Sequence, residues 1–153
     1  MERKYAGFIA FEGKPPPVDD EVRSAMEKLW EKGLKLRTGH LFRIESDVIP
    51  GCFYVDCVWI FGKEGEGPLY MEPAHKHDFD ELLGLIGSDE SDPKVLGAEV
   101  EFWIEDEKYY IDRSCIIFIP KGVVHCPMYI HSVTKPFFFF TMGNTPHYAR
   151  TKV

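Results

Sequence analysis

Three histidines and one glutamate lie in two short segments at a spacing that suits a metal site. His75 and His77 are one residue apart, Glu81 follows, and His125 comes after a Pro-Lys-Gly turn signal at residues 120–122. Three neutral imidazoles and one carboxylate suit Fe(II), Mn(II), Ni(II), Co(II) or Zn(II) better than Mg or Ca, which prefer all-oxygen shells. Four protein ligands on an octahedral ion leave two positions for water, a bidentate substrate or dioxygen. We therefore predict a transition-metal site at these four residues.

The spacing also suggests how one segment supplies three of the ligands. Residues two apart in an extended chain point to the same side, so His75, His77 and Glu81 would face one way. The fourth ligand would come from a facing strand, which His125 opens after the turn. The alternative is a pair of histidines that only decorates a surface loop. The glutamate of matching parity and the second segment, in the right order, favour the metal interpretation.

The two segments resemble the two motifs of the cupin superfamily. His75-Lys76-His77, three residues and Glu81 match HxHxxxE, and Pro120-Lys121-Gly122-Val123-Val124-His125 matches PxGxxH. The similarity covers about residues 53–142. It implies a small double-stranded β-helix, or jelly-roll barrel, with the metal held inside. It also implies dioxygenases, isomerases, lyases and decarboxylases as relatives, without choosing among them.

The rest of the chain agrees with one all-β domain that carries an added N-terminal part. A chain of 153 residues has the size of a single domain, and 12 Phe, 7 Tyr and 3 Trp favour a sheet core. Val22, Met26, Leu29 and Trp30 recur at a helical spacing, which predicts one amphipathic helix over about 20–32. We expect residues 1–50 to form an arm and helix that pack on the barrel, and residues 51–153 to form the barrel.

Nine short strands are predicted, and with almost no helix between them they cannot form a parallel sheet. They are 34–37, 41–45, 53–61, 81–86, 98–104, 108–111, 115–119, 125–130 and 137–142. Residues 100–111 should form a hairpin with an acidic turn. Residues 137–140, four phenylalanines, should be covered on both faces. Residues 5–11 could form a further short strand before the Pro run at 15–17.

Composition excludes several partners. Acidic residues outnumber basic ones, 25 to 18, and no segment gathers Lys and Arg, which argues against nucleic acid. No window reaches the roughly 18 apolar residues of a membrane span, and no signal peptide is visible. We expect a cytoplasmic protein that binds neither nucleic acid nor membrane. Its four cysteines are then expected to be buried free thiols, with a disulfide or zinc framework as the alternative.

The sequence predicts the roles of several other residues less specifically. His40 and His147 are interpreted as solvated or capping histidines, and His131 as a strand-end residue that shares the parity of His125. Asp78 and Asp80 could orient the ligand imidazoles or simply face solvent. Tyr54, Tyr129, His131 and Glu101 could supply an extra titratable group near the metal. Phe102, Phe118 and Tyr129 could make the interior partly apolar.

Three functions remain open from the sequence. The first is a metal-dependent enzyme, dioxygenase-like or isomerase- or lyase-like, that acts on a small chelating organic molecule. The second is a binding or sensing module without turnover. A metal-free structural barrel ranks last because all four ligand residues are present. We also expect a homodimer, because the arm, the Pro run and the helix suit an interaction across a two-fold axis.

Overall fold

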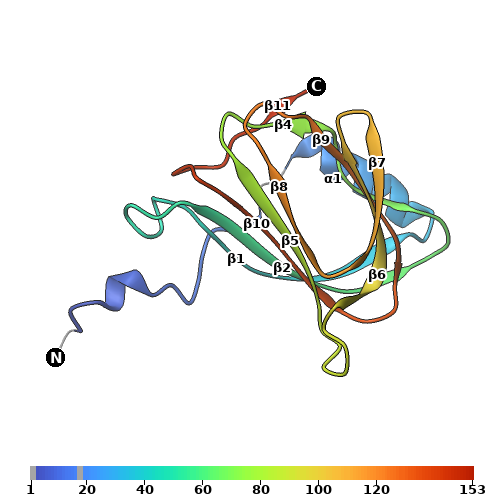
Figure 1. Cartoon of the computed structure of the whole chain (residues 1–153), viewed down its shortest axis with the longest axis horizontal. Helices are drawn as coiled ribbons and strands as arrows, with labels where there is room; N and C mark the ends of the chain where they lie inside the picture. Colours follow the sequence, from blue (N-terminus) through green and yellow to red (C-terminus); the bar gives the residue numbers. More distant parts are fainter. Residues whose placement is uncertain (1–2, 17–18) are drawn as a thin grey trace.

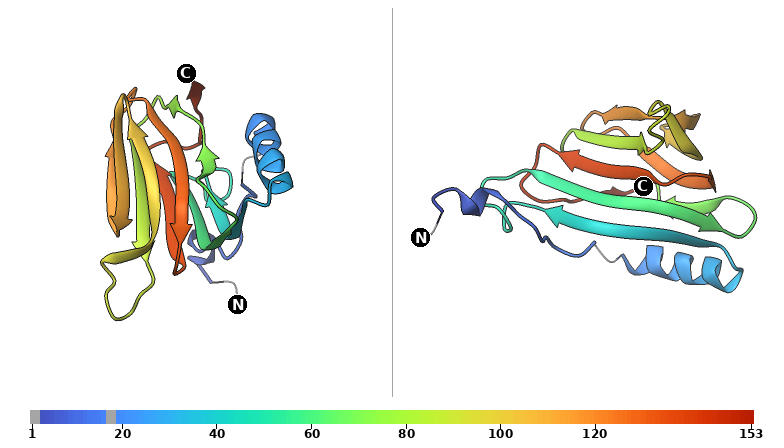
Figure 2. Two further views of the ribbon diagram at one scale, coloured as in Figure 1. Left: turned by 90° about the vertical axis from the view of Figure 1, so that its right-hand side faces the viewer. Right: turned by 90° about the horizontal axis from the view of Figure 1, so that it is seen from below.

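A computed structural model describes residues 3–16 and 19–153 of the chain. Two antiparallel sheets face each other and enclose the core (Figures 1 and 2). The first sheet has the order β1-β2-β10-β5-β8: β1 is Lys35–Ile44, β2 is Tyr54–Glu64, β10 is Phe137–Gly143, β5 is Glu81–Gly87 and β8 is Cys115–Ile119.

The second sheet has the order β11-β4-β9-β6-β7, and β3 also pairs with β9. Here β3 is Leu69–Glu72, β4 is His75–Lys76, β6 is Val95–Ile104, β7 is Glu107–Arg113, β9 is His125–Val133 and β11 is Thr151–Lys152. The chain passes back and forth between the sheets, from β4 to β5 to β6 and from β8 to β9 to β10. This topology confirms the predicted all-β double-stranded β-helix.

The core follows from the alternation of side chains along the strands. On β6, Val100 and Phe102 are buried while Glu99 is exposed, as expected where one face of a strand packs inward. Ile60, Leu85, Ile130 and similar side chains from both sheets complete the same cluster. The predicted hairpin is present as β6 and β7, with its turn at Glu105, whose φ is +51°.

The predicted helix is confirmed as α1, Asp20–Glu31. Asp19 caps it by accepting a hydrogen bond from the Glu21 N–H at 2.9 Å. Of its apolar stripe, Val22, Met26 and Leu29 are half-buried and Trp30 is exposed. The helix lies beside β3 (Figure 2). Among the described residues, no helix is both long and apolar enough to cross a membrane.

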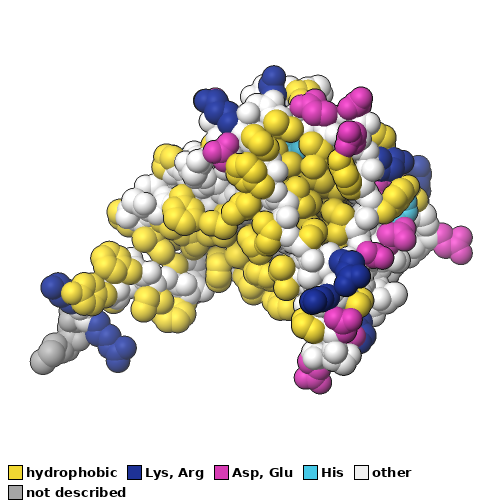
Figure 3. Space-filling model, viewed as in Figure 1, with side chains coloured by type: hydrophobic (Ala, Val, Ile, Leu, Met, Phe, Trp, Pro, Cys, Tyr) yellow, Lys and Arg dark blue, Asp and Glu magenta, His cyan; other side chains and the backbone are white. Residues whose placement is uncertain are grey.

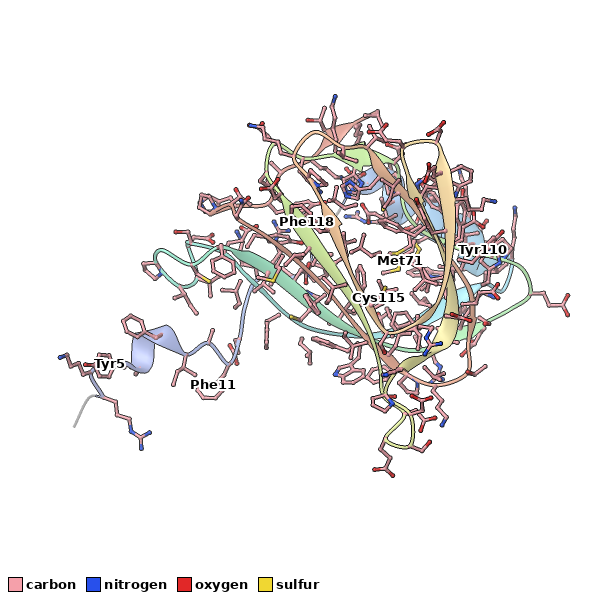
Figure 4. The ribbon with its side chains drawn as sticks, in the orientation of Figure 1. Tyr5, Phe11, Met71, Tyr110, Cys115 and Phe118 are labelled. Carbon is pink, nitrogen blue, oxygen red and sulfur yellow. The ribbon has the colours of Figure 1, made fainter. Side chains whose placement is uncertain are left out.

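Two predictions about the N-terminal part need correction. Residues 5–11 form no strand; Ala6–Phe8 is a 3₁₀ turn closed by the Ile9 N–H on the Ala6 carbonyl. The reason is that this arm projects away from the barrel and has no neighbouring strand to pair with, and Tyr5 and Phe11 on it lie clear of the barrel (Figures 1 and 4). Of the predicted Pro run, residue 17 lies outside the described residues. The strands predicted at 34–37 and 41–45 are one strand, β1, which joins the first sheet.

The four phenylalanines at 137–140 are covered on only one face. Phe137 and Phe139 are buried between the sheets, whereas Phe138 and Phe140 are half-buried on the outer face. There Trp59 packs on Phe138, and Phe138 on Phe140. Within one chain the outer face is thus only partly covered, and coverage by a second subunit stays a prediction. The free thiols are as predicted, although only Cys57 and Cys126 are buried and Cys52 and Cys115 are partly exposed.

Candidate metal centre

The four predicted ligand residues meet inside the barrel. His75 is on β4 and His125 opens β9, directly opposite it in register. Glu81 begins β5 in the other sheet, and His77 lies in the connection between β4 and β5. All four side chains are buried, and their donor atoms lie within 4.8 Å of one another. We call these residues the four-donor cluster.

The convergence does not arise from an extended strand, as the spacing had suggested. β4 is only two residues long, and the chain turns between His77 and Glu81 to cross from one sheet to the other. His125 comes from the neighbouring strand and Glu81 from the facing one, the reverse of the expected roles. The structure brings the four predicted residues together, but the parity explanation of how they meet was wrong.

Backbone carbonyls fix the orientation of each imidazole. The Nδ1 atoms of His75, His77 and His125 lie 2.7, 2.6 and 3.3 Å from the carbonyl oxygens of Pro73, Ala149 and Val123. A carbonyl oxygen can only accept, so each Nδ1 carries the proton and each Nε2 keeps a lone pair. This is the outer-shell arrangement typical of metal-binding histidines. The three rings therefore present acceptors, and not donors, to the centre of the cluster.

Two of these imidazole nitrogens lie close to a carboxylate oxygen, which is also an acceptor. Nε2 of His125 is 3.0 Å and Nε2 of His77 is 3.4 Å from the same Oε2 of Glu81. Within the described part of the chain, neither Nε2 has a hydrogen-bond partner although both are fully buried. Buried lone pairs that face a carboxylate at this distance repel one another unless a cation lies between them. The donor set therefore fits a bound metal ion.

The protonation states agree with this interpretation. Burial lowers the pKa of His75 to about 4, so its imidazole is neutral at neutral pH. Neutral imidazoles beside an ionised carboxylate are the forms that bind a divalent ion.

The loop that carries His77 is tied to the turn before His125. The Gly122 N–H donates to the His77 carbonyl at 2.9 Å, and Gly122 has a φ of +84°, which a residue with a side chain rarely adopts. Asp80 accepts the Lys121 N–H at 2.9 Å. Asp80 thus connects the two motifs without touching a ligand imidazole, whereas Asp78 is exposed beside the Lys121 amine.

The segment after β10, residues 144–152, closes over the cluster; we call it the C-terminal segment. It supplies the Ala149 carbonyl that orients His77, and the Tyr148 ring packs on the His77 ring at 5.2 Å between centroids. β11 pairs with β4 beside His75. Arg150 binds Glu72 and, at 2.5 Å, Asp19 at the start of α1. Sequence reasoning missed this role, because a backbone carbonyl has no residue signature.

A cavity of about 440 Å³ opens beside the cluster. His75, Glu81 and His125 line one part of it, and Met71, labelled in Figure 4, lies between the two sheets. Its other apolar and polar walls come from both sheets, α1 and the C-terminal segment: Val22, Val58, Leu83, Met128, Phe139, Asp19, His40, Tyr54, Asp56, Glu72, Thr141, Tyr148 and Arg150. Of the aromatic residues predicted for the interior, Phe102 is buried, but Phe118 is exposed on the outside.

The other titratable candidates divide between this cavity and the outer surface. Tyr54 lines the cavity, where its hydroxyl lies 2.6 Å from Thr141 Oγ1. His131 lies near the end of β9, as predicted, and pairs with Glu101 at 2.9 Å on the outer face of the second sheet. Tyr129 packs on Tyr70. His40, interpreted as a solvated or capping residue, instead lines the cavity.

Both motif segments therefore converge on one buried cluster at the interior of a double-stranded β-helix. The chain has the cupin fold. No family model matches the chain, and no curated protein matches it by sequence. Solved structures similar to this cupin barrel include an oxalate oxidase in complex with the substrate analogue glycolate, at 13% identity and a TM-score of 0.47, covering 80% of this chain and 56% of that one.

Two others are a cupin-like protein from Thermotoga maritima and the polyketide cyclase RemF from Streptomyces resistomycificus. The first is 12% identical with a TM-score of 0.48, over 77% of this chain and 75% of that one. The second is 16% identical with a TM-score of 0.47, over 79% and 73%. The chain thus spans little more than half of the oxalate oxidase. At these identities and TM-scores the likeness says nothing about the reaction.

Proposed function

We propose that this protein is a metal-dependent enzyme that acts on a small chelating organic molecule. His75, His77, Glu81 and His125 would hold a divalent transition ion, with Fe(II), Mn(II), Ni(II), Co(II) and Zn(II) all compatible with the donor set. The observation that carries the proposal is the buried Glu81 oxygen facing two imidazole lone pairs. When bound, such an ion supplies Lewis-acid chemistry toward a chelating ligand and, if it is iron, chemistry with dioxygen.

The cavity supports a small-molecule substrate. Its volume of about 440 Å³ lies within the range of ligand pockets, and its wall combines apolar side chains with a few polar groups. Three cluster residues line it, so a ligand in the cavity would reach the ion directly. Tyr54 and Thr141 stand on the same inner face and can orient that ligand through their hydroxyls.

A cobalt titration tests the proposal. Metal-free protein is titrated with Co(II), and the visible absorption of the ion is followed as it enters a site of mixed nitrogen and oxygen donors. We expect one equivalent to bind, and a chelating probe such as acetohydroxamic acid to change the spectrum further. No binding of cobalt, or binding without any response to the chelator, would refute an accessible metal centre. Elemental analysis of protein purified without added ions would then identify the native metal.

We also propose a homodimer formed through the outer face of the first sheet. Phe53, Phe61, Ile116 and Phe118 are exposed on this side, and Figure 3 shows hydrophobic side chains gathered over it. The projecting arm adds four more exposed apolar residues, Tyr5, Phe8, Ile9 and Phe11. Exposed apolar side chains that gather on one face are typical of protein–protein contact surfaces. Light scattering should give twice the monomer mass at micromolar concentration, and a monomer mass would exclude the dimer.

A further inference from the structure

Part of the cavity wall beside the four-donor cluster is apolar. Five apolar side chains from the two facing sheets line it, and we call them the apolar patch: Val58, Leu83 and Phe139 from the first sheet and Met71 and Met128 from the second. All five belong to the hydrophobic core or pack against it. A ligand in the cavity would therefore touch side chains that the core holds in place from behind.

Strand register orders the patch relative to the cluster. Glu81 and Leu83 point to the same side of β5, so Leu83 is the next inward side chain along the strand from the predicted metal ligand. Thr141 lies opposite Leu83, and Phe139 and Val58 form the following row on β10 and β2. Successive rows are about 7 Å apart. The patch therefore begins beside the cluster and extends away from it.

The two methionines form the side of the patch that belongs to the second sheet. Met128 comes three residues after His125 on β9, and Glu72 on β3 pairs with it, so Met71 and Met128 are neighbours across the two strands. Figure 4 shows Met71 between the sheets. Methionine side chains are unbranched and adapt to irregular apolar shapes. This side of the patch can therefore adjust to apolar groups of different shape.

The charged groups of the wall are already paired. Asp19 and Glu72 bind Arg150, and Asp56 Oδ1 lies 2.7 Å from His40 Nε2. The fourth carboxylate of the described wall belongs to the four-donor cluster. Within that wall a carboxylate of the ligand would find no free cation, and an ammonium would have to displace an existing partner. The recognition that the wall offers to the outer part of a ligand is therefore apolar.

We propose that the cavity takes a chelating molecule that carries an uncharged, apolar substituent, and that the apolar patch is the subsite for that substituent. The chelating end would bind the ion at the four-donor cluster. The substituent would extend past Leu83 toward Phe139. The inference rests on the metal site of the proposed function and names the class of its substrate. It also assigns specificity to residues that take no part in holding the ion.

A homologous series of hydroxamic acids tests the inference. Acetohydroxamic, butyrohydroxamic and hexanohydroxamic acid share one chelating group and differ in the length of the alkyl chain. Each is titrated by calorimetry into cobalt-loaded protein. Burial of one methylene strengthens binding about fourfold, so butyrohydroxamic acid should bind about 15-fold more tightly than acetohydroxamic acid. Hexanohydroxamic acid should bind more tightly still. Equal affinities across the series would overturn the apolar subsite.

Probes with a charged end separate apolar burial from electrostatic attraction. Adipic acid monohydroxamate and 6-aminohexanohydroxamic acid have the chain length of hexanohydroxamic acid and end in a carboxylate or an ammonium. Both should bind at least about tenfold more weakly than hexanohydroxamic acid, because the charged end would lose its hydration without gaining a free partner. Tighter binding of either charged probe would show that the wall selects charge and would contradict the proposal.

Polar substitutions of similar size locate the subsite. Met71→Gln and Val58→Thr each place a polar group in the patch. The gain from acetohydroxamic to butyrohydroxamic acid should fall to about fivefold or less, whereas the affinities for cobalt and acetohydroxamic acid should not change. Met142→Gln is the matched control, because Met142 is half-buried on the outer face of β10 and is not among the described residues that line the cavity. An equal gain in all three variants would place the substituent elsewhere.

The outcomes distinguish this inference from the proposed function. Failure of cobalt to bind, or of acetohydroxamic acid to bind the cobalt-loaded protein, would refute the accessible metal centre itself. Binding of both without any gain from a longer chain would leave the metal centre intact and overturn the subsite alone. Should one patch variant not fold by circular dichroism, the other variant and the series on the native protein still decide.

Discussion

The barrel contains two clusters of histidine and carboxylate that look alike by proximity and differ in chemistry. One is the four-donor cluster; the other, which we call the Glu45 cluster, consists of Glu45, Asp47 and His147. In the Glu45 cluster the carboxylates already meet cations. Lys14 lies 2.7 Å from Glu45 and 2.9 Å from Asp47, and Arg43 binds the other oxygen of Glu45.

The two clusters differ in whether their carboxylate oxygens have hydrogen-bond donors, and this difference indicates which cluster needs a metal ion. Around Glu45, donors from Lys14, Arg43 and the Tyr148 N–H satisfy both carboxylate oxygens. In the four-donor cluster, the fixed tautomers leave lone pairs facing the Glu81 carboxylate, with no side-chain cation among the described residues at the cluster. Unsatisfied acceptors, more than the presence of histidines, therefore indicate where a cation is needed.

Substitution of one ligand should produce the largest contrast between the clusters. His77→Ala removes a lone pair from the four-donor cluster, so metal content by elemental analysis should fall to about a tenth or less. His147→Ala, the corresponding change in the Glu45 cluster, should leave it unchanged because that histidine is exposed and not needed for a cation. Equal metal content in the two variants would refute the distinction.

The Glu45 cluster should instead matter for stability. Glu45→Gln leaves the buried Arg43 guanidinium without its ionised partner, which should cost about 3 kcal/mol of the free energy of unfolding, measured in urea. Metal content should not change. Asp47→Asn is the matched control, since an exposed pair is worth less than about 1 kcal/mol. A loss of metal in Glu45→Gln would show that the clusters are not independent.

Acid should weaken the contribution of Glu45 in a defined range. Burial would raise the pKa of Glu45, but hydrogen bonds from Lys14, Tyr148 and Arg43 outweigh it and lower the pKa from 4.5 to about 2. A depressed native pKa contributes stability above 4.5 that is lost as the pH falls toward 2. The stability difference between native protein and Glu45→Gln should therefore shrink over this range. A constant difference would contradict an ionised Glu45.

The smallest effect should come from loosening the C-terminal segment. Arg150→Ala breaks its links to Glu72 and Asp19, so the Ala149 carbonyl holds His77 less firmly. Cobalt affinity should fall by about tenfold. Lys152→Ala removes the ion pairs that an exposed amine of the same segment makes with Asp19 and Glu21, and it should have no effect because Arg150 still holds Asp19. Equal affinities in all three proteins would mean that the segment does not support the site.

The sequence predicted those parts of the site that depend on which side chains are present. The all-β class, the helix and the four converging residues could be predicted from residue types and spacing, and the double-stranded β-helix was implied by the resemblance to the cupin superfamily. The contributions of backbone carbonyls and of pairing between distant strands could not be predicted. The Ala149 carbonyl has no signature, β4 and β11 are too short for periodicity to detect, and His40 reaches the cavity only because β1 pairs with β2.

The bond between His77 and Ala149 spans 72 residues and makes ion binding and docking of the C-terminal segment reciprocal. Whatever favours one must favour the other by the same free energy. An ion in the cluster would stabilise the pairing of β11 with β4, and a partner that pulled β11 away would lower the affinity for the ion. The affinity for the ion should therefore depend on whether the C-terminal segment is docked on the loop that carries His77.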